Sequence, residues 1–274
     1  MEMIDVSVLL SIYHKEQVDY FIKAMESILV QTKQPEEIFL VADGPLTESL
    51  DEAISEYKEK LNDRLTFFRL DENKGLGIAL AEGVIRCRNP YIARMDTDDI
   101  MDPQRLEIQY DTFLNNTDLA IVGSNIIEFE SEITNVLGER NVPEKNEEIR
   151  NFSKRRNPFN HMTVMFKKEA ILKVGNYKTL NGFEDYYLWV RLLKAGFKAN
   201  NIQKNLVYAR AGKEMYYRRG GRKYLISGIK ARKVIYQEGL GKLSDFLFVT
   251  IAHTMVSIMP NKMRGYFYQK KLRN

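Results

Sequence analysis

Residues 91–99 read YIARMDTDD, an apolar, β-prone run that ends in three aspartates, Asp96, Asp98 and Asp99. Ligands of open α/β sheets bind beyond the carboxyl ends of the strands, so these acids stand where a site is expected. In an extended chain, residues i and i+2 point to the same side, and the carboxylates of Asp96 and Asp98 can converge on one cation, or on a ribose and a cation. Carboxylate oxygens suit Mg²⁺ or Mn²⁺, so we expect a metal site made by the three aspartates.

An acidic turn that caps a helix is the simpler interpretation of such residues. It suits Asp102, which precedes Pro103 as the N-cap of a helix should. It suits Asp96, Asp98 and Asp99 less well, because three carboxylates at one strand end repel each other unless a cation neutralises them.

The chain before this stretch alternates β-prone and helical segments, which predicts an α/β fold with a mainly parallel sheet covered by helices. Beyond residue 100 the order is less regular, although the apolar face over residues 185–195, followed by Gly196, predicts a helix. In the first half, strands are expected at 6–12, 37–42, 65–70 and 91–95, and helices at about 17–31, 50–61 and 76–88. In the second half we expect a helix from Asp102, strands near 120–128 and 163–166, and polar loops at 131–147 and 151–160.

The length and composition are typical of a folded protein rather than a disordered or fibrous one. A chain of 274 residues can form one large α/β domain, or one domain and a tail. The single cysteine, Cys87, has no partner for a disulfide, and we interpret it as a packing residue in a reducing compartment. The first residues lack the basic start and apolar core of a signal peptide, so we expect a cytoplasmic protein.

Charge is divided unevenly along the chain. Residues 210–274 carry 15 Lys and Arg against 3 Asp and Glu, a net charge of +12, whereas residues 1–209 carry 26 against 34, a net charge of −8. Within the basic region, the stretch 246–259 has no charged side chain with His neutral. Its polar residues form one narrow helical stripe, made by Thr250, His253, Thr254 and Ser257.

As a helix, this stretch would reach about 21 Å, less than the roughly 30 Å of a hydrocarbon core. It is expected to lie on a membrane surface, where basic neighbours meet anionic headgroups or the diphosphate of a lipid carrier. The alternative is a helix that docks on the preceding domain and leaves a solvated basic face. Both interpretations make residues 210–274 a helical, basic C-terminal region.

Several segments in a fixed order together resemble the family 2 glycosyltransferases, from about residue 5 to about residue 208. Members of this family have a GT-A fold, and the resemblance implies a nucleotide-binding half at 1–100 and an acceptor-binding half at 101–209. The chain is most similar to bacterial members that build capsular, exopolysaccharide or O-antigen repeat units. The segments are VSVLLSIYHKE (6–16), IFLVADG (38–44), ENKGLGIALAEG (72–83), RMDTDD (94–99), NPFNHMTVMFKKEAILKVGNY (157–177) and GFEDYYLWVRL (182–192).

The resemblance implies a donor site at the ends of the first strands. Ser11, Tyr13 and Glu16 match positions that border the nucleotide, and Asp96 is expected to serve the nucleotide as well as the metal. Asp43 matches the aspartate that accepts hydrogen bonds from the base, usually uracil, although an ordinary turn residue is the alternative. A loop beside the nucleotide and ribose is matched by Asn73, Lys74 and Gly75.

The resemblance also assigns the acceptor side. Asp185 is expected to be the catalytic base that takes the proton from the acceptor hydroxyl, with Glu184 beside it and helix capping as the alternative role. His161 is expected to contact the metal, the diphosphate or the acceptor, or else to be a structural hydrogen-bonding residue. Tyr186 and Trp189 are weaker candidates for acceptor contacts, because aromatic residues at helical spacing more often form a core.

These implications describe an inverting, metal-dependent glycosyltransferase. It would use Mn²⁺ or Mg²⁺ to transfer a hexose or N-acetylhexosamine from a UDP-sugar to a polyprenyl-diphosphate-linked glycan, at the inner face of the plasma membrane. One alternative is a sugar nucleotidyltransferase, which would be expected to carry a glycine-rich, basic N-terminal loop that this sequence lacks. Another is a nucleic-acid-binding protein that uses the basic region, but this leaves the acidic motif unexplained.

Overall fold

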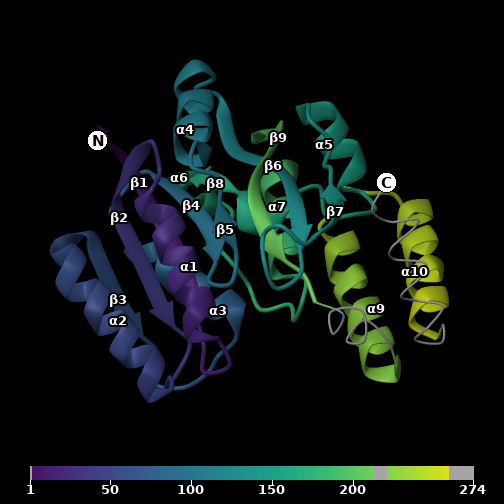
Figure 1. Cartoon of the computed structure of the whole chain (residues 1–274). Helices are drawn as coiled ribbons and strands as arrows, with labels where there is room; N and C mark the ends of the chain where they lie inside the picture. Colours follow the sequence, from purple (N-terminus) through teal and green to yellow (C-terminus); the bar gives the residue numbers. More distant parts are fainter. Residues whose placement is uncertain (1, 213–220, 259–274) are drawn as a thin grey trace.

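The computed structural model describes residues 2–212 and 221–258, and its centre is one mixed sheet with helices on both faces (Figure 1). The strands lie in the order β3-β2-β1-β4-β8-β6-β9-β5, and β7 pairs with β6. Strands β3, β2, β1 and β4 are parallel, whereas β8 runs antiparallel to β4 and β6. The strands are β1 (Glu2–Ile12), β2 (Lys33–Ala42), β3 (Leu65–Arg69), β4 (Tyr91–Asp96), β5 (Ile100–Met101), β6 (Leu119–Phe129), β7 (Val136–Arg140), β8 (Met165–Lys167) and β9 (Lys198–Arg210).

The alternation of side chains along β1 divides the core into two layers. Val6, Val8 and Leu10 pack on one face of the sheet, against α1 (Val18–Leu29), α2 (Glu48–Leu61) and α4 (Arg105–Asn115). Leu9 packs on the other face, against α3 (Leu76–Arg86), α6 (Lys168–Lys173) and α7 (Glu184–Lys194). Because both faces are covered, β1 is a nearly continuous apolar run, as expected for a parallel strand.

Helix α3 lies very close to the sheet. A Cβ atom on Gly83 would lie 2.3 Å from Leu9 Cδ1, so a larger residue there would force the Leu9 side chain to move. Cys87, just after α3, is buried in the same layer, which confirms that it is a packing residue. The close packing fixes the loop before α3, which is part of the candidate site.

The second half differs from the expectation in several places. The presumed loop 131–147 contains β7, and α5 (Asn146–Phe152) begins at its end. The predicted helix starts at Arg105 rather than Asp102, because Asp102 Oδ1 accepts a hydrogen bond from Gln104 N–H (3.0 Å) and closes a turn before the helix. The long strand β9 was not foreseen, since it is rich in Asn, Lys and Gln and is held by backbone pairing with β6.

The C-terminal region forms two helices, α9 (Gly221–Gln237) and α10 (Leu243–Ile258), at the end of the molecule opposite α2 (Figure 1). Ile235 of α9 packs against Tyr186 and Val190 of α7, so the pair is docked on the rest of the chain. None of the helices in the described part of the chain combines the length and apolar character that a membrane-spanning segment requires. The parts of the basic region at 213–220 and 259–274 lie outside the described residues.

Candidate active site

The carboxyl ends of three parallel strands bring the expected donor residues to one edge of the sheet. Ser11 of β1 lies opposite Asp96 of β4. Ile12 lies opposite Ala42, the residue before Asp43. This register places Ser11, Asp43 and Asp96 on neighbouring strand ends, while their contacts with a nucleotide stay a prediction.

Asp43 is buried and holds the loop 73–75 in place. Its Oδ1 accepts a hydrogen bond from the backbone N–H of Lys74 (2.7 Å), and its Oδ2 accepts one from Gly75 (3.0 Å). The Asn73 side chain donates to the carbonyl oxygen of Asp43 (3.2 Å). Gly44, at φ +89°, leaves no space for a side chain, since a Cβ atom would lie 2.6 Å from Asn73 N. Asp43 therefore ties two loops together, a role that neither interpretation of the sequence included.

Glu16 connects the loop after β1 to the acidic motif. Its Oε2 accepts a hydrogen bond from the Thr97 hydroxyl (2.5 Å), and its Oε1 accepts one from the backbone N–H of Gln17 (2.9 Å). Tyr13, in the same loop, has an exposed side chain. The loop thus offers an aromatic ring near the acids.

The three acids of the motif form a cluster that fits a divalent cation. Carboxylate oxygens of Asp96, Asp98 and Asp99 all lie within 4.8 Å of one another. Asp99 Oδ1 accepts a hydrogen bond from Arg210 N–H (2.8 Å), but its buried Oδ2 has no hydrogen-bond partner among the described residues. Oxygen donors of this kind are the ones that Mg²⁺ and Mn²⁺ prefer, and the unpartnered Asp99 oxygen is one that a cation would satisfy.

Arg94 lies buried beside the acidic cluster, and its role was missed in the sequence. Its Nη1 donates to Asp96 Oδ2 (2.8 Å) and its Nη2 donates to Asp96 Oδ1, which makes a bidentate ion pair. Arg105 donates to the Arg94 carbonyl oxygen (2.7 Å) and helps to fix this part of β4. A signal was present, because Arg94 and Asp96 are two residues apart on one strand and therefore face the same side.

The pKa values of the acids reflect their crowding. Burial, followed by the charges of Asp96 and Glu16, raises the pKa of Asp98 to about 7. Burial and the charge of Asp98 raise the pKa of Asp99 well above its usual range, although Arg94 opposes this. Arg94 pairs with Asp96, and the charge of Arg210 only partly opposes the increase at Asp98, so a cation would supply the charge that the cluster still lacks.

His161 lies outside this group of carboxylates. It belongs to a short 3₁₀ turn (His161–Thr163), and its Nε2 is 2.9 Å from the Tyr177 hydroxyl. Burial and the charge of Arg94 lower the pKa of His161 well below its usual range, so the ring is neutral. Among the described residues, the group that could hold a metal ion consists of the three aspartates without His161, so this geometry gives the metal role of His161 no support.

The aromatic residues considered for acceptor contacts are core residues instead. Trp189 is fully buried, with its ring packed against Phe159 and Tyr177. Tyr186 is only 5% exposed and donates a hydrogen bond to the Ser153 carbonyl oxygen (2.6 Å). The expectation is wrong for both, because this face of α7 points into the protein and not toward solvent.

Asp185 lies in the first turn of α7, where its Oδ2 accepts a hydrogen bond from the Asn157 side chain (2.5 Å). Burial raises the pKa of Asp185, while the hydrogen bonds from Tyr186 N–H and Asn157 oppose the increase. The pKa of the neighbouring Glu184 is raised by burial too. Glu184 packs tightly on α3, since a Cβ atom on Gly77 would lie 2.9 Å from Glu184 Cγ. Asp185 is therefore an oriented carboxyl group with an increased affinity for a proton.

Electrostatic coupling links Asp185 to the acidic cluster. The charge of Arg94 lowers the pKa of Asp185 and also that of Asp99. The hydroxyl of Tyr177, whose pKa is raised mainly by burial, is influenced by both Asp185 and Asp96. Arg94 thus influences the acidity of both Asp185 and the acidic cluster.

The model of the family described as "Glycosyl transferase family 2" matches residues 7–180, which include the second half of β1, the acidic cluster and His161. The chain belongs to glycosyl transferase family 2. Membership favours sugar transfer over the nucleotidyltransferase and nucleic-acid-binding alternatives. It makes the strand edge with its acidic cluster the candidate active site of a glycosyltransferase.

Two relatives of this family 2 member cover nearly its whole length. An Escherichia coli protein named UDP-Gal:alpha-D-GlcNAc-diphosphoundecaprenol beta-1,3-galactosyltransferase is 38% identical over 267 residues, which are 97% of this chain and 96% of the relative. The amylovoran biosynthesis glycosyltransferase AmsE of Erwinia amylovora is 35% identical over 265 residues, 96% of this chain and 98% of the relative. The resemblance to enzymes of bacterial surface polysaccharide synthesis is thereby confirmed.

Solved structures confirm the GT-A fold of this family 2 member. S. aureus TarS 1–349 in complex with UDP-GlcNAc aligns with a TM-score of 0.65 at 14% identity, over 98% of this chain and 79% of TarS. The mannosyltransferase PcManGT from Pyrobaculum calidifontis, in complex with GDP-Man and Mn²⁺, aligns with a TM-score of 0.60 at 13% identity, over 98% and 84% of the two chains. At these identities the likeness concerns the fold.

The buried ion pair gives the first prediction. Arg94→Met should lower the free energy of unfolding by about 3–5 kcal/mol, because it leaves the Asp96 charge unpaired beside two other carboxyls. The double variant Arg94→Met, Asp96→Asn should recover part of this loss, since the uncompensated charge is gone. Urea denaturation of both variants measures the difference, and equal or greater loss in the double variant would contradict the ion-pair account.

Proposed function

We propose that this glycosyltransferase moves a hexose or N-acetylhexosamine from a UDP-sugar to a hydroxyl group of a lipid-linked glycan, with inversion at the anomeric carbon. The observation that carries the proposal is the oriented carboxyl of Asp185, coupled through Arg94 to the acidic cluster. Asp185 and the cluster supply two different kinds of chemistry, a proton acceptor and a binding site for diphosphate. Transfer without a covalent enzyme intermediate needs both in one site.

The strand edge is the proposed donor site. Ser11, Tyr13 and Glu16 border the nucleotide, and the Asp43 loop with Asn73, Lys74 and Gly75 holds the base and ribose. Asp96, Asp98 and Asp99 would hold Mn²⁺ or Mg²⁺, which neutralises charge on the diphosphate and so favours departure of UDP. Arg94 orients Asp96 for that purpose through their bidentate ion pair.

Asp185 is the proposed general base. It accepts the proton of the acceptor hydroxyl as that oxygen attacks the anomeric carbon, and the bond from this carbon to the diphosphate breaks with its electron pair leaving on UDP. Attack opposite the leaving group inverts the configuration, so an α-linked donor gives a β-linkage. Glu184 stands beside Asp185 as a neighbouring acid whose pKa is raised by burial and by the Asp185 charge.

The lipid-linked acceptor is supported by similarity and by the C-terminal region. The E. coli relative is named for an acceptor in which a sugar is joined through diphosphate to undecaprenol, and it aligns with 97% of this chain. Helix α10 has a large apolar surface exposed to solvent, and residues 210–274 carry a net charge of +12. Both features suit peripheral binding to an anionic membrane surface, at the inner face of the plasma membrane.

Asp185→Asn should leave the binding of UDP-sugar unchanged and slow turnover by about two to four orders of magnitude, the usual contribution of a positioned base. UDP release should be measured with a panel of UDP-hexoses and UDP-N-acetylhexosamines, and with GlcNAc-diphosphate on a short alkyl chain as acceptor. Glu184→Gln is the matched control and should lose much less activity. Near-wild-type turnover in Asp185→Asn would show that another residue acts as the base.

The hydrogen bond from Asn157 gives a separate prediction. It stabilises the ionised form of Asp185, so Asn157→Ala should raise the pKa of that carboxyl further. Because the base acts when ionised, the acidic limb of the kcat–pH profile should move to higher pH in this variant. An unchanged profile with lower kcat at every pH would indicate a purely structural effect instead.

The raised pKa of Asp98 predicts how metal binding depends on pH. In the metal-free protein the folded state holds this proton up to about pH 7, whereas an unfolded aspartate loses it near pH 4, so stability falls as pH rises between about 4 and 7. A cation binds the deprotonated site and offsets this loss, and the increase in Tm on adding Mn²⁺ should therefore grow from pH 6 to pH 8. Thermal unfolding with Mn²⁺ or with chelator measures it, and Asp98→Asn should weaken the pH dependence, leaving the part that Asp99 contributes.

A further inference from the structure

A basic groove lies between the segment after α5 and the start of α10, away from the strand edge that forms the donor site. It has a volume of about 510 Å³, within the range of small-molecule sites. Four basic side chains line it against one carboxylate, that of Asp245. The basic residues are Lys154, Arg155, Arg156 and Lys242.

The carboxylate in the groove is already neutralised. Asp245 Oδ1 accepts a hydrogen bond from Arg155 Nε (2.6 Å), and its Oδ2 accepts one from the backbone N–H of Lys242 (3.0 Å). These contacts lower the pKa of Asp245, so it is ionised and paired. The groove therefore keeps an excess of positive charge, which suits a multiply charged anion.

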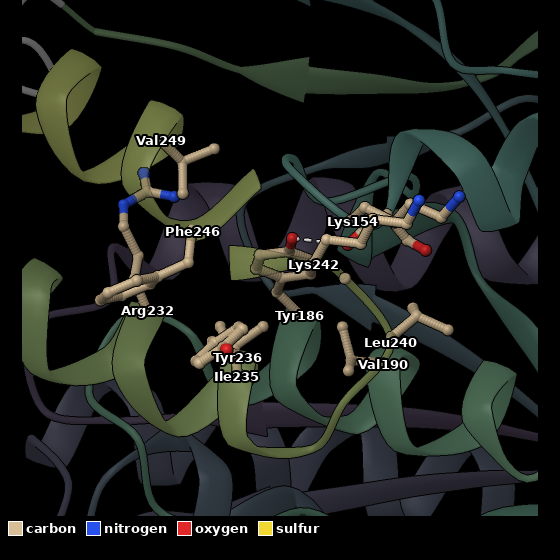
Figure 2. A pocket seen from close by; sticks show the side chains of 12 residues that line it. Lys154, Tyr186, Val190, Arg232, Ile235, Tyr236, Leu240, Lys242, Phe246 and Val249 are labelled. Atoms are coloured by element: carbon tan, nitrogen blue, oxygen red, sulfur yellow. Dashed lines mark hydrogen bonds between the residues drawn. The ribbon is translucent and has the colours of Figure 1, made fainter. Parts of the chain in front are cut away.

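The floor beside the groove is rigid and closed. The Tyr186 hydroxyl bonds to the Ser153 carbonyl oxygen, and side chains of α7, α9 and α10 pack around Tyr186 below Lys154 and Lys242 (Figure 2). The cavity left there measures about 20 Å³, room for little more than one water molecule. Tyr186 thus supports the basic segment, and the ligand-sized space is the groove.

Helix α10, which begins at the groove, has its polar stripe turned inward. His253 and Ser257 are 5% and 3% exposed, and a Cβ atom on Gly228 of α9 would lie 2.0 Å from His253 Nε2. Large apolar side chains point outward instead, each at least 50% exposed, namely Leu243, Leu247, Phe248, Ile251 and Met255. Exposed apolar residues in such a row are unusual on a surface helix and indicate contact with an apolar partner.

The groove and the apolar row are contiguous. Arg155 lies over the ring of Phe248, with its guanidinium carbon 4.9 Å from the ring centre. The basic segment also leads directly to the proposed base, since Asn157, which bonds to Asp185, follows Arg155 by two residues, a span of at most about 7 Å. The groove therefore contacts the apolar row through Arg155 and Phe248, and it is connected to the base through Asn157.

We propose that this groove binds the diphosphate of the lipid-linked acceptor, while the exposed row of α10 carries the prenyl chain at the membrane surface. The inference rests on the proposed function, in which the acceptor sugar is joined directly to a lipid diphosphate. The sugar next to a diphosphate in the groove then reaches Asp185, because only Asn157 separates the basic segment from the base. Binding to the anionic headgroups of a membrane would also use the basic side chains and the apolar row. It would not require these features to lie next to Asp185.

The test uses the full-length protein and farnesyl diphosphate as the probe, in chelator so that the acidic cluster cannot hold the diphosphate through a cation. Lys154→Gln with Arg156→Gln should weaken its binding by about tenfold or more. Both side chains are exposed and the pair leaves the ion pair of Arg155 with Asp245 intact, so the fold should be retained. Lys230→Gln with Lys233→Gln, on the exposed part of α9, is the matched control and should bind the probe like wild type.

A second variant tests the apolar row. Phe248→Ser with Ile251→Ser should weaken the binding of farnesyl diphosphate but leave that of inorganic diphosphate unchanged, since only the prenyl chain meets α10. Co-sedimentation with phosphatidylglycerol vesicles tests the alternative that the groove binds the phosphate of a membrane headgroup rather than the diphosphate of the acceptor. Binding to the vesicles without binding to farnesyl diphosphate would overturn the proposal, as would equal losses in the groove variant and the α9 control. UDP-sugar binding is measured separately with Mn²⁺ and without chelator, and its absence in the wild type would refute the proposed function instead.

Discussion

The buried ion pair between Arg94 and Asp96 is the constraint on which the rest of the site depends. A guanidinium at the end of a central strand is costly to bury, and it is stabilised by a bidentate carboxylate on the same face of β4. Arg94 then influences several titratable groups around it, including Asp99, His161 and Asp185. Together with burial, its charge keeps the ring of His161 neutral.

The pair compensates only one of three carboxylates. Asp98 and Asp99 remain crowded and partly deprived of solvent, so their pKa values rise, and an oxygen of Asp99 lacks a partner among the described residues. A site of this kind has too little positive charge near its carboxylates, and it therefore favours a bound cation. Asp185 has a different environment, because burial raises its pKa while Asn157 orients it. The two carboxyl sites thus have different environments, which suits the separate tasks that we propose for them.

The C-terminal helices present the apolar surface that we propose to meet a lipid. Their packing reverses the usual arrangement, with His253 and Ser257 inside and Phe248 and Ile251 outside. The helix pair is nevertheless docked on α7, through Ile235 and Val190. The two interpretations of the basic region, a docked helix and a membrane-facing helix, are therefore compatible, since α9 provides the docking and α10 provides the outward apolar face.

The sequence by itself determined the parallel half of the sheet, because apolar runs such as that of β1 are local signals. It also determined the acidic motif, because the end of a strand fixes where neighbouring side chains converge. It also indicated Asp185, through resemblance and its place at a helix start. Only the tertiary structure decided that Trp189 and Tyr186 are core residues, that Asp43 holds a neighbouring loop, and that Asn157 orients Asp185. Each of these depends on which distant segment covers a residue, and hydrophobic periodicity identifies an apolar face without identifying its partner. The sequence likewise did not show which side of α10 faces solvent. Its polar stripe is buried by α9, and the sequence pattern of α10 does not reveal this contact.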